Sequence, residues 1–429
     1  MNICVVALGK IGLPLAVQFA RSGHTVIGAD ISPATVDLVN AGIAPFPGEA
    51  HLDDYLAEVV GAGQLTATTD VTEAVRRSEV VIVVVPLIVD RDKQPDFGAL
   101  DHATAAISAG LQPSTLVIYE TTLPVGTTRQ RFAPALSSAS GLTVGSDLFV
   151  AFSPERVYSG RIFADLSRYP KLVGGVDGAS TERAISFYNA VLQFDDRDDL
   201  LHPNGVWNLG NSEAAELAKL AETTYRDINI GFANELARHA DVHDIDIFQV
   251  IAACNSQPFS HIHQPGIAVG GHCIPVYPHV YLAGDPSALI PAAARRTNDA
   301  MPAYAVSRLA DRIGNLQGLT VAVLGLAYRG GVKESAFSGA FGTAEALLAA
   351  GAAPVVHDPL YTDDELVAVA LTPYHLGERC DAAIIQADHV EYRSLRSADL
   401  GGAKVVVDGR RCLDSRTDLD VVTLGGGAR

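Results

Sequence analysis

The stretch Asn2-Ile3-Cys4-Val5-Val6-Ala7-Leu8-Gly9-Lys10-Ile11-Gly12 opens the chain with an apolar run that passes directly into a glycine-rich turn. A continuous apolar run of this length is typical of a parallel strand that is buried on both faces. A helical spacing of Ala16, Phe19 and Ala20 follows. A second apolar run then ends at Asp30, 18 residues after Gly12. The order strand, glycine turn, helix, strand and acid predicts a βαβ unit at the start of a doubly wound sheet.

The glycine turn and the acid together predict a dinucleotide-binding site. Gly9, Lys10, Ile11 and Gly12 lead into a helix whose N-terminal N–H groups would attract a pyrophosphate. Asp30 would accept hydrogen bonds from a ribose and repel a 2′-phosphate, so we expect NAD in preference to NADP. The first glycine of the usual motif is replaced by alanine here, which leaves open a strand–helix turn without a ligand.

Further apolar runs indicate that this architecture continues along the chain. Strands are expected at 80–85, 116–119, 149–152, 171–175, 319–327, 355–359, 381–385 and 404–408. Over 212–240, apolar residues such as Leu217 and Phe232 recur every three or four positions, which predicts one long helix. The prediction is an α/β fold: two Rossmann-like doubly wound parallel-sheet domains joined by a central helical region with a long spine helix. The expected domains are 1–200, 201–302 and 303–429, with a frayed end from Gly425 to Arg429.

Composition and charge exclude several classes of partner. Hydrophobic residues make up 48% and charged residues 19% of the 429, which is enough apolar surface for packed cores. The net charge of −18 argues against nucleic acid and anionic membranes. The five cysteines have no CxxC spacing, so we expect reduced thiols in a cytoplasmic enzyme without a metal site. The sequence pattern predicts neither a signal peptide nor a membrane span.

Candidate site residues gather where the predicted strands end, which is the ligand-binding edge of an open parallel sheet. Pro86 follows one strand, Thr121 and Thr122 another, and Glu155 a third. Either threonine is equally compatible with a helix N-cap. The loop Gly270-Gly271-His272-Cys273 places a cysteine after glycines and beside a histidine. This arrangement fits a thiolate nucleophile or a small buried hydrophobic residue.

Taken together, these stretches resemble the UDP-glucose/GDP-mannose dehydrogenase family, the nucleotide-sugar 6-dehydrogenases. The resemblance implies an N-terminal NAD domain, a central dimerisation region and a C-terminal domain that binds the sugar nucleotide. It also implies a nucleotide-sugar substrate, a homodimer, and oxidation of the sugar C6 alcohol to the uronate with two NAD in succession. The matching signatures are collinear: Gly9–Ala16, Glu120–Thr122 with Gly126–Thr128, Ser153–Val157, Ala218–Glu222, Gly270–Cys273 and Asn298–Asp299.

The resemblance also assigns catalytic roles. Cys273 matches the family's nucleophile, which would hold the intermediate as a thiohemiacetal and then as a thioester. Lys219 matches the lysine that stabilises oxyanions, although a helix lysine facing water fits the pattern as well. Glu155 matches the glutamate that positions water or assists proton transfer.

Three positions depart from the family pattern. Thr223 stands where an asparagine usually shares the oxyanion role, and Tyr277 stands where an aspartate is thought to act as base. Because tyrosine is neutral near pH 7, the proton transfer would fall to Glu155 or to another group. Phe259 stands where members acting on N-acetylated sugars often place an arginine.

We therefore expect UDP- or TDP-glucose as the substrate. The alternative enzyme is a UDP-N-acetylhexosamine 6-dehydrogenase of the N-acetylmannosamine type. The alternative from another class is a catalytically impaired nucleotide-sugar-binding protein. Arg410 and Arg411 are assigned to the diphosphate because guanidinium forks suit phosphate, with surface arginines as the alternative. The expected cofactor ligands are Gly9, Lys10, Ile11, Gly12, Asp30, Pro86, Thr121, Thr122, Glu155, Gly270 and Lys333, and the expected substrate ligands are Arg156, Lys219, Gly270, Tyr328, Arg329 and Arg410.

Overall fold

The computed structural model describes residues 1–90 and 92–427. By its internal contacts the chain divides into two compact units. Unit 1 consists of Met1–Glu222 with His279–Gly284, and unit 2 consists of Thr223–Pro278 with the chain from Asp285 onward. The finer division into three domains stays a prediction.

Unit 1 is built on a sheet with the strand order β10-β9-β8-β7-β4-β1-β2-β3. Its strands pair in parallel, except that β8 and β9 run antiparallel. All residues of β4, β7 and β8 are buried, which explains their unbroken apolar sequences. Strand β9 is buried as well, yet it begins with a lysine. The strands are β1 (Asn2–Val6), β2 (Thr25–Ala29), β3 (Leu65–Thr68), β4 (Val80–Val83), β7 (Thr115–Tyr119), β8 (Leu148–Phe152), β9 (Lys171–Gly175) and β10 (Val206–Asn208), with a separate hairpin of β5 (Ile88–Val89) and β6 (Pro95–Asp96).

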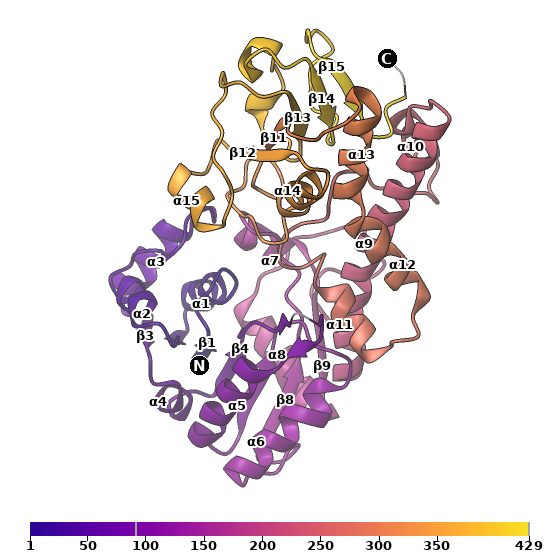
Figure 1. Ribbon diagram of the computed structural model, residues 1–429. Helices are drawn as coiled ribbons and strands as arrows, with labels where there is room; N and C mark the ends of the chain where they lie inside the picture. The colour runs from indigo at the N-terminus through magenta and orange to yellow at the C-terminus, as the bar shows by residue number, and fades with distance from the viewer. Residues whose placement is uncertain (91, 428–429) are drawn as a thin grey trace. The chain divides into compact units, whose positions relative to one another are not determined.

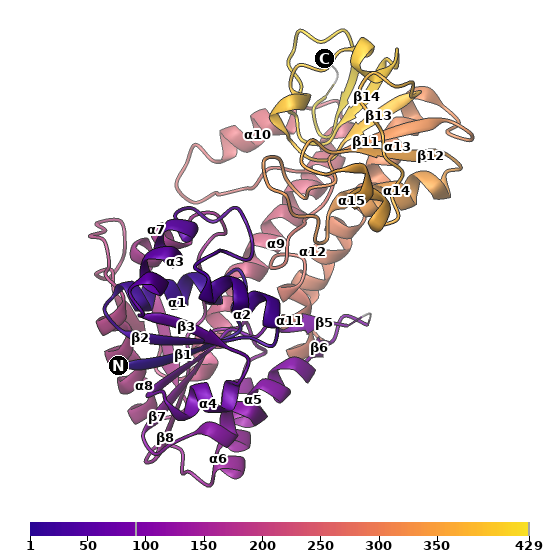
Figure 2. The same ribbon diagram turned by 90° about the vertical axis from the view of Figure 1, so that its left-hand side faces the viewer.

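Helices cover both faces of this sheet. In Figure 2, α1 and α3 lie on one side of the strands and α4 and α5 on the other. The predicted doubly wound fold is therefore confirmed for this unit. The helices are α1 (Gly12–Arg21), α2 (Pro33–Asn40), α3 (Leu52–Gly61), α4 (Val71–Arg76), α5 (Gly98–Gly110), the π-helical η1 (Thr128–Phe132), α6 (Ala133–Ser140), α7 (Ile162–Arg168) and α8 (Gly178–Val191).

The long helix α9 (Ser212–Val242) confirms the spine predicted over 212–240 (Figure 1). Its residues up to Glu222 belong to unit 1 and the rest to unit 2. Part of the predicted apolar stripe is not buried, since Leu217 is 45% exposed and Phe232 is 52% exposed. Periodicity identified the helix correctly but could not tell which apolar side chains have a partner within the chain.

Unit 2 contains a parallel sheet with the order β12-β11-β13-β14-β15. This order also matches a doubly wound sheet, because β12 lies on one side of β11 and the next strand, β13, lies on the other. Its strands are β11 (Thr320–Leu324), β12 (Ala353–His357), β13 (Ala382–Ile385), β14 (Val405–Asp408) and β15 (Asp420–Thr423). The remaining helices are α10 (Ile247–Cys254), α11 (Tyr277–Gly284), which passes into unit 1, α12 (Leu289–Asp299), α13 (Met301–Ile313), α14 (Gly339–Ala349), α15 (Asp363–Ala368), and the 3₁₀ turns η2 (Val390–Tyr392) and η3 (Ser397–Leu400).

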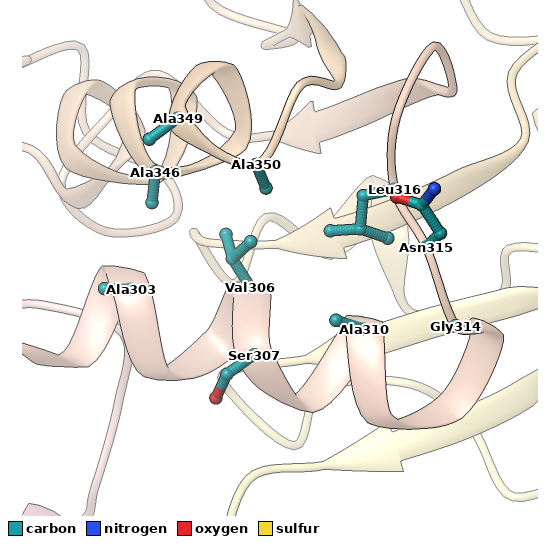
Figure 3. A pocket seen from close by; sticks show the side chains of 10 residues that line it. All are labelled: Ala303, Val306, Ser307, Ala310, Gly314, Asn315, Leu316, Ala346, Ala349 and Ala350. Atoms are coloured by element: carbon teal, nitrogen blue, oxygen red, sulfur yellow. The ribbon is translucent and has the colours of Figure 1, made fainter.

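A groove of about 450 Å³ lies between α13 and α14 in unit 2 (Figure 3). Small and apolar side chains dominate it, and none of its lining residues ionises, so it offers shape without acid–base groups. Its lining is Ala303, Val306, Ser307, Ala310, Gly314, Asn315, Leu316, Ala346, Ala349 and Ala350.

The predicted fraying from Gly425 is wrong for the described part of the tail. The Gly425 N–H donates to Asp241 Oδ1 at 2.9 Å, and its carbonyl accepts from Ile247 N at 2.7 Å. These bonds tie the segment after β15 to α9 and α10, while residues 428–429 lie outside the described residues. Among the described residues, each helix is too short or too polar to cross a membrane.

Candidate active site

The glycine turn of unit 1 has the geometry of a pyrophosphate cradle. A β-carbon at Gly12 would lie 1.9 Å from the carbonyl oxygen of Ala7, so this position must be glycine for α1 to approach β1. At Gly9, by contrast, a β-carbon would meet no described atom within 4 Å. The open side of Gly9 adjoins the N-terminus of α1, where unpaired N–H groups favour an anion. The residues present therefore fit the pyrophosphate of NAD.

Asp30 closes the same turn from the end of β2. Its Oδ2 accepts from Leu8 N at 2.7 Å and its Oδ1 accepts from Ser32 N at 2.9 Å. A carboxylate has about four acceptor sites, so two remain for ribose hydroxyls. The side chain is half-buried, which leaves it accessible from the edge of the sheet.

Ala7, which replaces the first glycine of the motif, adopts φ +78°. That left-handed conformation costs a residue with a β-carbon about 1 kcal/mol relative to glycine. Ala7 thus adopts a backbone conformation that favours glycine, and the departure in sequence is accommodated as local backbone strain.

The other predicted cofactor ligands occupy the edge of the sheet in varied ways. Lys10 and Pro86 are exposed, Ile11 is half-buried at the start of α1, and Thr122 is buried. The Thr121 hydroxyl donates to the Val85 carbonyl at 2.6 Å, which ties the end of β7 to the end of β4. Their contact with a cofactor stays a prediction.

A buried ionic cluster lies beside these strand ends. Lys171, at the start of β9, donates from Nζ to Glu120 Oε2 and to Glu155 Oε2, both at 2.8 Å. The Tyr188 hydroxyl of α8 donates to Glu120 Oε1 at 2.6 Å. The lysine side chain is 4% exposed, that of Glu120 is 0% exposed and that of Glu155 is 10% exposed. We name Glu120, Glu155, Lys171 and Tyr188 the Lys171 cluster.

Burial and pairing shift the proton affinities of the Lys171 cluster in opposite directions. Burial raises the pKa of Glu120 to about 7, against the pull of the Lys171 ammonium. Burial would also raise the pKa of Glu155, but Lys171 and the hydrogen bonds to its carboxylate bring it below the ordinary value. Burial disfavours the ammonium of Lys171, and the two carboxylates more than offset this, so its pKa is raised. Glu155 is thus the carboxylate that stays ionised at neutral pH.

Glu155 and Lys219 lie next to each other in unit 1. The Lys219 Nζ donates to the backbone carbonyl of Glu155 at 2.6 Å. The Glu155 Oε1 accepts from the N–H groups of Arg156 at 2.7 Å and Val157 at 3.2 Å, so its carboxylate is held from both ends. Arg156 itself forms an ion pair with Glu222, with Nε 3.0 Å from Oε2, and its contact with substrate stays a prediction.

The cysteine loop lies in unit 2. Cys273 is exposed, and its carbonyl accepts from Tyr277 N at 2.9 Å where α11 begins. A β-carbon at Gly270 would lie 2.3 Å from Cβ of Tyr328, so the loop packs closely on that tyrosine. Gly271 N donates to Ala336 O at 2.8 Å. An accessible thiol is thus presented on a loop that the C-terminal sheet domain anchors.

Thr223 is buried on α9 and Tyr277 is half-buried on α11. Both belong to unit 2 with Cys273, whereas Lys219 and Glu155 belong to unit 1. The fold therefore divides the predicted catalytic residues into two groups.

The predicted substrate ligands of unit 2 are partly engaged with each other. Arg410 donates from Nε to Gln386 O at 2.8 Å and from Nη2 to Tyr328 O at 3.1 Å. Arg329 Nε donates to the Tyr328 hydroxyl at 3.1 Å. Arg411 is the exception, because it forms a two-pronged ion pair with Asp246 at 2.8 Å.

Lys333, predicted beside the cofactor, forms an exposed ion pair with Glu365 at 2.6 Å. Lys171 was missed in the sequence. Its signal is visible afterwards: a lysine opens a run, Lys171-Leu172-Val173-Gly174-Gly175, that is otherwise typical of a buried strand.

The dinucleotide turn of unit 1 is typical of an NAD-dependent oxidoreductase. Family models match the chain in three segments: the NAD-binding domain over residues 1–192, the central domain over 213–299 and the UDP-binding domain over 322–415. The chain belongs to the UDP-glucose/GDP-mannose dehydrogenase family. NAD is its cofactor, and a nucleotide-sugar is the class of its substrate.

Similar proteins are named as nucleotide-sugar dehydrogenases. A UDP-N-acetyl-D-mannosamine dehydrogenase of Pyrococcus horikoshii is 35% identical over 424 residues, covering 96% of each chain. A solved UDP-D-ManNAc dehydrogenase from the same organism has a TM-score of 0.88 at 31% identity, with 100% of both chains covered. A UDP-glucose dehydrogenase of Pyrobaculum islandicum has a TM-score of 0.87 at 27% identity, with 100% of this chain and 98% of that chain covered.

Proposed function

We propose that this chain is a UDP-N-acetylhexosamine 6-dehydrogenase of the N-acetylmannosamine type. The support is the identity to UDP-N-acetyl-D-mannosamine dehydrogenases over nearly the whole chain. Fold similarity does not discriminate between the sugars, because the two solved relatives have TM-scores of 0.88 and 0.87. The comparisons thus favour the N-acetylhexosamine alternative over the UDP- or TDP-glucose expected from Phe259. That residue is 93% exposed, which makes it a weak indicator of specificity.

The observation that carries the reaction is the contact between Lys219 and Glu155, 2.6 Å from ammonium to carbonyl. It supports a site in which the Lys219 ammonium and the ionised Glu155 carboxylate both act at C6 of the sugar. A cation preset at developing negative charge in a site that excludes water is typically worth about 3 kcal/mol of transition-state stabilisation.

The mechanism assigns one task to each residue. When bound, NAD accepts the hydride in each of the two oxidations. Lys219 stabilises the alkoxide that forms when the C6 hydroxyl loses its proton. The Cys273 thiolate adds to the resulting aldehyde to give a thiohemiacetal, whose oxidation leaves a thioester. Glu155 takes a proton from the water that attacks the thioester, and the carboxylate and the free thiol are released.

The balance of this scheme is one alcohol, one water and two NAD⁺ converted to one carboxylate, two NADH and three protons. Thr223 can donate one hydrogen bond to the oxyanion in place of the usual asparagine. Tyr277 supplies no carboxylate, which leaves Glu155 as the base. A free thiol at Cys273 requires a reducing compartment, which we infer to be the cytoplasm.

A substrate screen tests the assignment. The full-length protein is incubated with NAD and UDP-N-acetylmannosamine, UDP-N-acetylglucosamine, UDP-glucose or TDP-glucose, and NADH is followed by absorbance. We expect two NADH per UDP-N-acetylmannosamine and the highest kcat/KM for that sugar. A higher kcat/KM for UDP-glucose would contradict the substrate. Tight binding without NADH from any of these sugars would favour a binding protein instead.

The Cys273→Ala variant tests the covalent step. It should bind the sugar nucleotide as the wild type does, measured by calorimetry, yet form no uronate by mass spectrometry. Cys254→Ala is the matched control, because that half-buried cysteine lies on α10 and has no role in the scheme. Unimpaired uronate formation by Cys273→Ala would refute the thioester.

We also infer a homodimer formed through α9 and α12. The support is their exposed apolar side chains: Tyr225 is 57% and Phe232 52% exposed on α9, and Leu289 is 81% and Ile290 67% exposed on α12. Large exposed apolar groups of this kind mark protein–protein interfaces. Light scattering should give twice the chain mass of 45.0 kDa. Phe232→Asp should give a monomer, and a wild-type monomer would rule the dimer out.

A further inference from the structure

Burying the charged groups of the Lys171 cluster has a large free-energy cost. Moving an ammonium and two carboxylates out of water costs several kcal/mol per ion unless each is paired. Here one lysine serves both carboxylates at 2.8 Å, and the Tyr188 hydroxyl adds a hydrogen bond to Glu120. A buried pair of this kind is weak evidence for stability, because apolar residues of the same volume would fill the space at least as well. The presence of this cluster next to Glu155 therefore calls for a functional explanation.

The geometry of the cluster is directional. Glu120 lies at the bottom, fully buried, and its two oxygens accept from Tyr188 and Lys171. Glu155 is more exposed than Glu120 or Lys171, with one oxygen on Lys171 and the other on backbone N–H groups. Lys171 thus connects an enclosed carboxylate to one that reaches the edge of the sheet.

The charges of the cluster add up unfavourably when both carboxylates are ionised, because one cation then faces two anions. A proton on Glu120 relieves this, and the burial that raises the pKa of Glu120 to about 7 favours that location. The groups that act on Glu120 are Lys171, Glu155 and Tyr188. Those that act on Glu155 are Lys171, Lys219 and the N–H of Arg156.

We propose that Lys171 is a positioning residue for the reaction: it acts through Glu155, holding that carboxylate in one orientation and ionised, while Glu120 anchors Lys171 from the buried side. The inference rests on the proposed function, because it gives Glu155 a task at the substrate. Lys171 itself touches no substrate atom. Because two neighbouring carboxylates beside one cation are not both ionised, the proton resides on Glu120, and Glu155 remains a base.

Two substitutions should affect the acid limb of the kcat–pH profile differently. Lys171→Met removes the cation beside Glu155, so the pKa of Glu155 rises and the limb moves to higher pH by roughly one to three units. Glu120→Gln mimics the protonated Glu120, which is already neutral at the pH where Glu155 titrates, so it should leave the limb in place. Lys171→Arg keeps the cation and should restore most of the wild-type profile. A structural role alone would lower the activity of Lys171→Met without moving its limb.

Further readouts separate chemistry from folding. In Lys171→Met, kcat should fall by at least about 100-fold with an almost unchanged KM for NAD, and the uronyl thioester should accumulate on Cys273 in the intact-mass spectrum. Lys404→Met, at an exposed lysine of unit 2, is the matched control and should behave as wild type. If Lys171→Met does not fold, Lys171→Gln, which also removes the cation, carries the test.

The proton affinity of Glu155 can also be measured without turnover. Glutamate labelled with ¹³C at the carboxyl carbon is titrated by NMR in wild type and both variants, with Glu155→Gln to assign the signal. A Glu155 midpoint that rises in Lys171→Met and stays in place in Glu120→Gln supports the positioning role even if the wild type oxidises no tested sugar, which would defeat the proposed function alone. Normal turnover with an unmoved Glu155 midpoint in Lys171→Met would overturn the positioning role alone.

Discussion

The two sheet domains of this chain share one construction at the end of the second strand of each sheet. In unit 1, Asp30 follows β2 and accepts from Leu8 N at 2.7 Å and from the N–H two residues further on at 2.9 Å. In unit 2, Asp358 follows β12 and accepts from Ala327 N at 2.8 Å and again from the N–H two residues further on at 2.8 Å. In each domain, an aspartate that follows the second strand accepts a hydrogen bond from the turn that follows the first strand.

The domains differ in what else meets that acid. Asp30 is half-buried, whereas Asp358 is 4% exposed and its Oδ2 lies 3.1 Å from Nε2 of the buried His389. The turns differ as well: five residues separate β1 from α1, while fourteen residues separate β11 from α14. The acid position that is open to a ribose in unit 1 is filled by protein in unit 2. A matching strand–turn–acid pattern therefore predicts a backbone arrangement, and the ligand depends on whether the acid keeps free acceptor sites.

The largest expected effect comes from removing the acid itself. Asp358→Ala should lower the free energy of unfolding by about 3 kcal/mol, because two backbone donors and a buried histidine lose their acceptor. Asp30→Ala should cost about 1 kcal/mol, since water can replace its carboxylate, but should raise the KM for NAD. Denaturant unfolding and steady-state kinetics of both variants check this. Equal losses of stability would contradict the distinction between an open and a filled acid.

Gly9 tests the cradle of unit 1. Gly9→Val should raise the KM for NAD by at least about 100-fold, equivalent to roughly 2.7 kcal/mol, because its side chain would fill the open side of the turn. The melting temperature should change little, since a β-carbon at Gly9 meets no described atom within 4 Å. Gly178→Val, at another position with open space, is the control and should leave the KM unchanged. Normal NAD affinity in Gly9→Val would place the pyrophosphate elsewhere.

The free energies of unfolding of the two units should depend on pH in opposite ways. The folded-state pKa of Glu120 is raised to about 7, above its unfolded value, so its stabilising contribution is present below pH 4.5 and is lost as the pH rises through 7. Burial would raise the pKa of Asp358, but His389 and two N–H groups lower it, so its contribution is present above about pH 4 and is lost on acidification. Each group can change the free energy of unfolding by up to about 1.4 kcal/mol per pH unit.

The chain's one tryptophan, Trp207, lies in unit 1 and reports on that unit by fluorescence. Between pH 5.5 and 8, unit 1 should become less stable, and Glu120→Gln should remove most of that slope. Unit 2, followed by hydrogen exchange, should lose stability below pH 4. A flat fluorescence-detected stability from pH 5.5 to 8 in the wild type would contradict the assignment for Glu120.

The smallest effect concerns the strained alanine of the turn. Ala7→Gly should raise the free energy of unfolding by about 1 kcal/mol at most, because glycine adopts φ +78° without penalty, although it also gains freedom in the unfolded chain. The matched control is Ala41→Gly, at the end of α2 with φ −82°, which should be neutral or destabilising. A loss of stability in Ala7→Gly would mean that the positive φ carries no strain.

The sequence predicted the fold well where patterns are local. The strands at 80–85 and 116–119 and the helix at 212–240 are observed because unbroken apolar runs and a 3.6-residue period reflect burial directly. The strands β3, β10 and β15 were not predicted, since they are short and lie at or near the sheet edges, where burial is partial. The sequence did not predict the substrate sugar well, because the prediction used a single position, Phe259, whose side chain is exposed.

By itself the sequence determined the dinucleotide turn, the doubly wound sheets and the spine helix, because each depends on the pattern of apolar residues and glycines along one stretch of the chain. Only the tertiary structure decided that Lys171 joins Glu120 to Glu155 and that His389 fills the acid position of unit 2. These contacts link residues between 16 and 51 positions apart that meet only at strand ends. Proton affinity and ligand access depend on such contacts, since both are set by burial and by the charges that the folded chain brings within a few ångströms.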